Sequence, residues 1–213
     1  MRCKKMVLSG LIVLSFLLGL ASASARAQGV DPAEAKADLQ RAVDGVLAIV
    51  RKPEYKDPAV QPGLMKQVEE KIYAIFDFTA FTAGTVGPRW RNFSQDEKTR
   101  LTDAFADLLR ATYLSKFEDY NGEDLLYTGE SVKGDRVEIA TVIRTTDNKQ
   151  IPMIYRMAKR DTWVVFDVVA EGMSLVQNYR TQFQDALIKE SPDQLIVRIK
   201  EQADRVRARK ASQ

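Results

Sequence analysis

The sequence predicts an α+β fold in which a four-stranded, curved antiparallel meander packs against several helices. Apolar residues recur at helical spacing before residue 122 and again from Gly172 onward. Between these segments, residues 124–170 form four strand-like runs that are joined by short turns, as in a meander. Helices, then consecutive strands, then helices is an order typical of α+β domains. A curved sheet that helices cover on one face forms a half-cone, which side chains fill or which encloses a cavity.

The first helix is expected to begin at Asp31, an N-cap that is followed by Pro32 and, three residues after the cap, by Glu34. Lys52-Pro53 ends it. Its apolar stripe consists of Leu39, Val43, Val46, Leu47 and Val50. A second helix carries on one face Met65, Val68, Ile72, Ile75 and Phe76.

Residues 77–87, DFTAFTAGTVG, predict one or two further helical turns. Ser94-Gln95-Asp96-Glu97 is a capping box that opens the most strongly patterned helix, and Asn121-Gly122 closes it. The inward face of this helix is expected to contain Leu101, Phe105, Leu108, Leu109, Thr112 and Phe117.

The four strands are expected at residues 124–132, 136–145, 151–159 and 163–170. In the second strand the residues expected to share one face are Val137, Ile139, Thr141 and Ile143. The fourth strand, WVVFDVVA, is apolar on both faces, with Trp163, Val165 and Val169 on one and Val164, Phe166 and Val168 on the other. Because a meander usually has one solvated face, helices on both sides or a bound lipid are needed to cover this strand.

Two helices follow the sheet. The helix expected from Gly172 has an apolar stripe of Leu175, Val176, Tyr179, Phe183, Ala186 and Leu187. Ser191-Pro192-Asp193-Gln194 caps the last helix, whose polar end, ADRVRARKASQ, is expected to fray.

Residues 1–27 have the pattern of a cleaved signal peptide. Basic residues precede the apolar segment 6–21, and Ala25-Arg26-Ala27 predicts cleavage before Gln28. Cleavage after Ala25 and an uncleaved membrane anchor are the alternatives. Removing this segment, with its four basic and no acidic residues, leaves 28 basic and 29 acidic residues and a net charge of −1. A single periplasmic domain, residues 28–210, is therefore expected, and the charge argument for nucleic acid binding is lost.

The chain has no histidine, and its single cysteine, Cys3, lies within the expected signal peptide. The usual Ser-His-Asp and Cys-His nucleophile systems and the commonest zinc ligands are thus excluded, and neither a catalytic residue nor a metal site is expected. Asp167 is expected to be structural and to pair with Arg180, because buried charges are usually paired. Arg89 and Arg91, which flank Trp90, either hold a phosphate headgroup or belong to a solvated loop.

Two stretches resemble the MlaC family, also called toluene- or organic-solvent-tolerance auxiliary proteins. They are FDFTAFTAGTVGPRWRNFSQDEKTRLTDAFADLLRATY and WVVFDVVAEGMSLVQNYRTQF. The resemblance implies an NTF2-like or cystatin-like half-cone with a lipid cavity, and a monomeric carrier that binds phospholipid as cargo and has no cofactor. It also implies two partners, an outer-membrane lipoprotein–porin complex and an inner-membrane ABC lipid transporter, and a role in outer-membrane lipid asymmetry.

The resemblance and the apolar pattern together nominate the lipid-binding residues. They are Phe76, Phe78, Phe81, Trp90, Phe105, Leu108, Leu109, Tyr113, Phe117, Val137, Ile139, Ile143, Tyr155, Val164, Phe166, Val168, Met173, Leu175, Val176, Tyr179 and Phe183. Three alternatives stay open at this point. One is a carrier of another lipid such as a hopanoid, and another is an adaptor that binds only proteins. The third is an NTF2-like isomerase or dehydratase with Asp167 as base and a tyrosine as acid.

Overall fold

The computed structural model describes residues 30–212, so the expected signal peptide lies outside the described residues. Four helices and three short 3-10 turns come first: α1 (Pro32–Val50), η1 (Pro53–Lys56), α2 (Gln61–Ile75), α3 (Phe78–Val86), η2 (Gly87–Asn92), α4 (Gln95–Tyr113) and η3 (Leu114–Phe117). The rest of the fold consists of β1 (Asp124–Lys133), β2 (Arg136–Arg144), β3 (Gln150–Lys159), β4 (Trp163–Ala170), β5 (Met173–Ser174), α5 (Leu175–Lys189) and α6 (Pro192–Ala211). Within this part of the chain no helix is long and apolar enough to cross a membrane.

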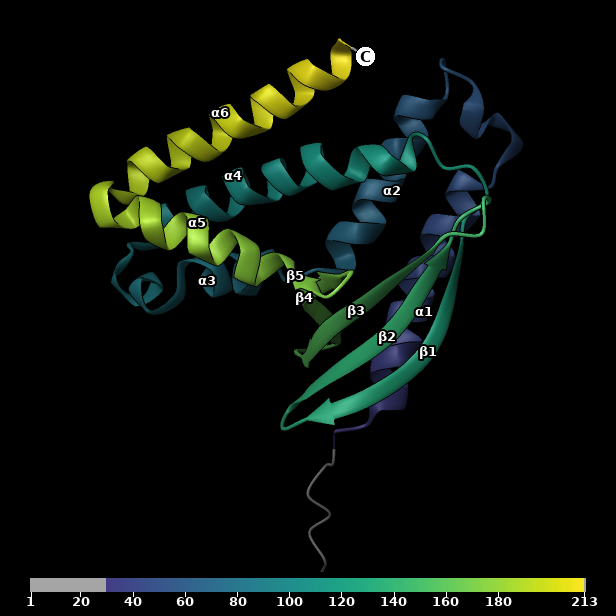
Figure 1. Ribbon diagram of the computed structural model, residues 1–213, viewed down its shortest axis with the longest axis horizontal. Coiled ribbons are helices and arrows are strands. Elements are labelled where there is room, and N and C mark those ends of the chain that lie inside the picture. The colour runs from purple at the N-terminus through teal and green to yellow at the C-terminus, as the bar shows by residue number, and fades with distance from the viewer. Residues whose placement is uncertain (1–29, 213) are drawn as a thin grey trace, which may run out of the picture.

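The elements form two regions (Figure 1). The sheet region consists of an antiparallel sheet with strand order β1-β2-β3-β4-β5, of α1 along one face of that sheet, and of α2 beside α1. The helical region consists of α3, α4, α5 and α6, in which α4 packs on α6 and α3 packs on α5. The α+β meander fold predicted from the sequence is thereby confirmed.

The predicted helix starts are confirmed by their caps. Asp31 accepts a hydrogen bond from the Ala33 amide, and both Ser94 and Ser191 form complete capping boxes. The polar end of the last helix differs from the expectation, because α6 continues to Ala211. Arg207 Nη1 lies 3.0 Å from Asp107 Oδ2 of α4, and Lys210 pairs with Glu118, so the two charged contacts hold the last turns against the helical region.

A short fifth strand was not predicted. Met173 and Ser174 pair with Ala170 and Val169, after a turn in which Glu171 and Gly172 have φ angles of 49° and 82°. The helix that was expected from Gly172 therefore begins at Leu175. Ser174 is its N-cap and accepts a hydrogen bond from the Gln177 amide.

A β-bulge in β4 corrects the predicted faces of that strand. Asp167 is opposite Arg156, but Val165 is opposite Met157, so Phe166 is the extra residue that has no partner in β3. The bulge shifts the alternation by one position. Val168 therefore packs in the same cluster as Trp163 and Val165, and does not share a face with Val164 and Phe166 as expected.

Candidate functional site

The inner face of the sheet, which is the face toward α1, is almost entirely apolar. Strand register places four rows of side chains on it: Leu125, Ile143 and Ile151; Tyr127, Thr141, Met153 and Ala170; Glu130, Ile139, Tyr155 and Val168; and Val132, Val137, Met157 and Val165. Thr141 and Glu130, which is exposed on the edge strand β1, are the two of these residues whose side chains are not largely apolar. Helix α1 covers only part of this apolar face.

One half of the inner face is closed by α1. Here Val137, Ile139, Met157 and Val165 are completely buried, and they cluster with Ala35 and Leu39 of α1. Polar contacts fix α1 at the same place. Asp38 Oδ2 accepts a hydrogen bond from the Trp163 amide at 2.9 Å, and Glu34 Oε2 pairs with Lys159 Nζ at 2.8 Å. The closed half is therefore ordinary protein core.

The other half of the inner face is incompletely covered. Its six side chains are only half-buried: Leu125, Tyr127, Ile143, Ile151, Met153 and Tyr155. We call these residues the open half. Apolar side chains that a sheet directs inward are normally buried by the elements packed on it, so this surface is available to an apolar ligand.

Phe76 and Leu175 connect the sheet to the helical region, because each packs against the core of both. The Asp77 amide donates a hydrogen bond to the Val165 carbonyl oxygen at 2.9 Å, which fastens this segment to β4. Aromatic rings extend the junction outward. The centroids of Phe76 and Phe78 are 5.8 Å apart, and those of Phe78 and Tyr73 are 4.6 Å apart. Apolar surface is thus continuous from the sheet to the helices.

Most of the predicted lipid-binding residues in the helical region form its core. The ring centroid of Phe105 lies 4.8 Å from that of Tyr179 and 5.1 Å from that of Phe183, with edge-on geometry in both pairs. Three more residues of the predicted set, Phe81, Leu108 and Leu109, are buried in this core. Five others pack at its margin: Phe76, Phe78, Trp90, Leu175 and Val176. The structure therefore brings these residues together by contact with one another.

The remaining predicted residues are divided among several places. Val137, Ile139 and Val168 belong to the core of the sheet region, and Tyr155 packs at its margin. Phe117 packs on a third cluster between α1, α2 and η3. Val164 and Phe166 are half-buried on β4, and the Phe166 ring lies 4.7 Å beneath the Arg136 guanidinium. Tyr113 and Met173 are exposed. Of the predicted set, only Ile143 and Tyr155 lie in the open half.

Asp167 is buried and both of its carboxylate oxygens accept hydrogen bonds, but its charged partner is not the predicted Arg180. Its Oδ2 lies 2.9 Å from Arg156 Nη1 and accepts a hydrogen bond from Ser174 Oγ at 2.7 Å, while Oδ1 accepts one from the Val176 amide at 3.1 Å. Arg156 also pairs with Glu138. Arg180 instead lies against Gly87, where its Nη2 would be 3.0 Å from an added Cβ. Asp167 thus joins β3, β4 and the start of α5.

The predicted headgroup arginines belong to η2 in the helical region. The Arg89 guanidinium donates a hydrogen bond to the Leu187 carbonyl oxygen near the end of α5, where a basic side chain stabilises the helix. Arg91 is exposed on the same turn. Neither arginine is part of the open half.

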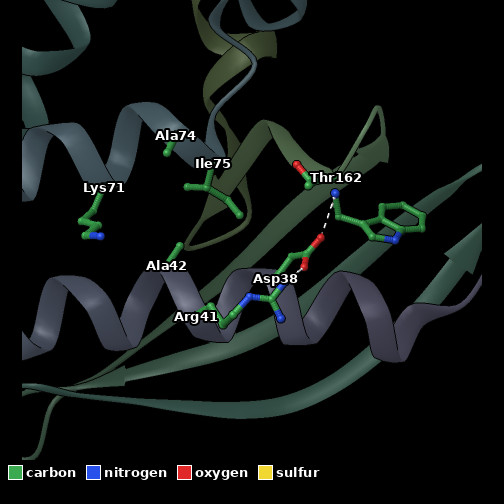
Figure 2. A pocket seen from close by; sticks show the side chains of 8 residues that line it. Asp38, Arg41, Ala42, Lys71, Ala74, Ile75 and Thr162 are labelled. Atoms are coloured by element: carbon green, nitrogen blue, oxygen red, sulfur yellow. Dashed lines mark hydrogen bonds and ion pairs between the residues drawn. The ribbon is translucent and has the colours of Figure 1, made fainter.

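Two hollows on the surface are lined by residues that do not belong to the open half. The first, of about 230 Å³, lies between α1, α2 and the β3–β4 turn and is lined by charged residues such as Asp38, Arg41 and Lys71 (Figure 2). The second, of about 510 Å³, lies at the start of α5 beside Arg156, Ser174 and the exposed Met173. Among the described residues, no group of three acidic, histidine or cysteine side chains is arranged to hold a metal ion.

A family model described as MlaC protein matches residues 40–201, which is most of the chain. This chain belongs to the MlaC family. MlaC proteins are lipid-binding carriers and not a family of enzymes, and no curated protein matches the chain significantly.

A solved structure has the same MlaC-like fold. It is that of a phospholipid-binding protein from Ralstonia solanacearum in complex with a phospholipid, at a resolution of 1.53 Å. The two chains superpose with a TM-score of 0.72 at 23% sequence identity, over 81% of this chain and 98% of that one. The likeness establishes the fold of the MlaC chain, including its open five-stranded sheet.

Four residues of the open half, Leu125, Tyr127, Ile151 and Met153, were not predicted from the sequence. The alternation in β2 identified Thr141 and Ile143 as inward-facing. Register then places Tyr127 and Met153 beside Thr141, and Leu125 and Ile151 beside Ile143. The signal was thus present in the two hairpins of this MlaC chain, but it needed the pairing partners of each strand.

Proposed function

We propose that this MlaC chain is a periplasmic carrier of phospholipid, and that the acyl chains lie against the open half of the inner sheet face and the junction at Phe76 and Leu175. The observation that carries the proposal is the half-covered apolar face, which continues into the helical region through these two residues. A relative with the same fold was crystallised with a phospholipid, which supports the same kind of ligand here.

The energetics explain why a carrier needs such a surface. A two-chain phospholipid has about 30 methylenes, each worth about 0.8 kcal/mol when it leaves water, so an unprotected passage would cost more than about 20 kcal/mol. A carrier replaces the bilayer by an apolar surface of similar quality. It needs no chemical step, and the direction of transfer then depends on the complexes that it docks on, at the outer and inner membranes.

The carrier function is tested by the lipid content of the protein. Full-length protein is exported in a Gram-negative host, purified without detergent and extracted with organic solvent, and the extract is analysed by mass spectrometry. We expect diacyl phospholipid in a defined ratio to protein, and uptake of labelled phospholipid from vesicles by delipidated protein. Protein that carries no lipid and accepts none would refute the carrier function, and turnover of a small carbonyl compound would favour the isomerase alternative.

A matched pair of variants locates the ligand. Met153→Trp adds a large ring to the open half and should reduce bound phospholipid to background. Ile154→Trp makes the same kind of change at the next residue, which is half-buried on the outer face, and should leave the lipid content unchanged. Circular dichroism confirms that both variants fold. Equal loss in both, or no loss in either, would place the lipid elsewhere.

A further inference from the structure

Two buried hydroxyl groups on the inner sheet face have no hydrogen-bond partner. They are the phenolic oxygen of Tyr127 and Oγ1 of Thr141. The two residues are direct register partners on β1 and β2, so their side chains project side by side from the same face. Thr141 is only 1% exposed. Buried polar groups in native proteins nearly always have a partner, because an unpaired hydroxyl loses its hydration without compensation.

The surroundings of this hydroxyl pair are apolar. Met153 is the next residue in the row across β3, and Ile139 and Tyr155 occupy the neighbouring row. Burial raises the pKa of Tyr127 well above its usual range, and the charges of Tyr155 and Asp44 raise it further. A neutral hydrogen-bond acceptor therefore suits the pair, whereas an anion would be repelled and poorly solvated at this place.

The location of the pair connects it with the ligand. Tyr127 is itself a member of the open half, and Thr141 lies between the Tyr127 and Met153 side chains of that surface. Both hydroxyl oxygens are covered in this structure, so a group that enters the open half reaches these two donors when half-buried side chains such as Met153 shift. A carbonyl oxygen has two lone pairs and accepts two such hydrogen bonds.

We propose that Tyr127 and Thr141 form an anchor for an acyl-ester carbonyl of the bound lipid, and so select ester-linked glycerolipids over lipids without that group. This inference rests on the proposed carrier function. Each hydroxyl donates to the carbonyl oxygen, and no bond is broken. The anchor would favour diacyl phospholipids over ether-linked analogues and over polycyclic hydrocarbon lipids, and it would fix how deeply the acyl chains lie on the sheet.

The test is a competition between two phospholipids of equal headgroup and chain length, one with ester and one with ether linkages. Delipidated full-length protein is equilibrated with vesicles that contain both in equal amounts, and the bound lipid is quantified by mass spectrometry. Since one hydrogen bond is worth a few-fold in affinity, wild-type protein should favour the ester lipid by roughly three- to tenfold.

The variants assign that preference to the two hydroxyls. Tyr127→Phe/Thr141→Val removes both with little change of shape and should bind both lipids equally, while its lipid-free stability stays the same or rises. Thr141→Ser retains a hydroxyl and should keep the preference.

The outcomes separate the anchor from the carrier function. Equal binding of ester and ether lipids by wild-type protein would overturn the anchor and leave the carrier function intact, and it would mean that the hydroxyls hold only water. A preference that survives in the double variant would also overturn it. Binding of neither lipid by wild-type protein would refute the carrier function, and the anchor with it.

Discussion

The helical region and the sheet region use their apolar residues in opposite ways. In the helical region the aromatic side chains of α3, α4 and α5 contact one another, and Phe105 is completely buried among them. In the sheet region half of an equally apolar face is left partly exposed, with two hydroxyls that have no partner. Density of aromatic residues thus indicates where this fold is stabilised, whereas missing coverage is the feature on which the proposed lipid site rests.

The largest expected effect is on stability, and it tests whether the helical region is packed more tightly than the open half. Phe105→Ala should lower the free energy of unfolding by about 3–5 kcal/mol, because it leaves a cavity between Phe81, Tyr179 and Phe183. Met153→Ala, at a half-buried position of the open half, should cost less than about 2 kcal/mol. Urea denaturation of lipid-free protein measures both. Equal costs would mean that the two regions are packed alike.

The next effect separates the two faces of β4. Val168→Glu sets a carboxylate on the inner face beside Tyr155, which should lower stability by about 3 kcal/mol and remove the bound lipid. Val164→Glu, at a half-buried position on the other face, should be milder and keep the lipid. Circular dichroism and lipid extraction of both proteins provide the measurement. If both variants lost lipid while folded, the bulge would not separate the faces as described.

A smaller effect is expected at the point where the two regions meet. Asp167→Asn weakens the contacts with Arg156 and Ser174 and should cost about 2 kcal/mol, with no loss of a catalytic step. A double-mutant cycle with Arg156→Met should give a clear coupling energy, and a cycle with Arg180→Met should give none. Coupling to Arg180 alone would restore the pairing that was expected from the sequence.

The smallest effect concerns alkaline pH. Burial raises the pKa of Tyr155 to about 12, whereas an unfolded tyrosine titrates near about 10. A group whose pKa is raised on folding stabilises the protein below its unfolded pKa, so this contribution is lost as pH rises from about 10 toward 12. Tyr155→Phe does not ionise and should show a smaller fall of the urea midpoint over that range. An identical fall in both proteins would show that Tyr155 does not contribute.

The sequence was sufficient for most of the fold because local signals decided it. The caps at Asp31, Ser94 and Ser191 and the short turns between strands each depend on a few neighbouring residues. The bulge at Phe166 and the strand Met173–Ser174 were missed because neither follows from the alternation within one segment. The bulge depends on the register of β4 with β3, and the two-residue strand forms through a tight turn directly after β4. Alternation within WVVFDVVA contains no sign of an extra residue.

The open half could be identified only in part from the sequence, for a related reason. Phe105 and Tyr155 have similarly apolar surroundings in sequence, but the first is enclosed by other helices and the second is left half-covered. Whether an apolar side chain is covered depends on how the helices pack on the sheet, and the sequence of a single segment does not indicate this. Arg180 was a reasonable partner for Asp167 by proximity along the chain, but the cross-strand neighbour Arg156 is closer in space.

The docking of α1 on β4 constrains the order in which the chain folds. Asp38 contacts the Trp163 amide across 125 residues, and Glu34 contacts Lys159 across the same separation. Helix α1 therefore finds its place only when the last long strand, β4, is available, and such distant contacts form slowly. Until then the hairpins β1–β2 and β2–β3 expose the whole inner face to self-association. We therefore expect an emerging chain of this design to bind a holding chaperone, and nascent chains that stop before residue 163 to bind it most strongly.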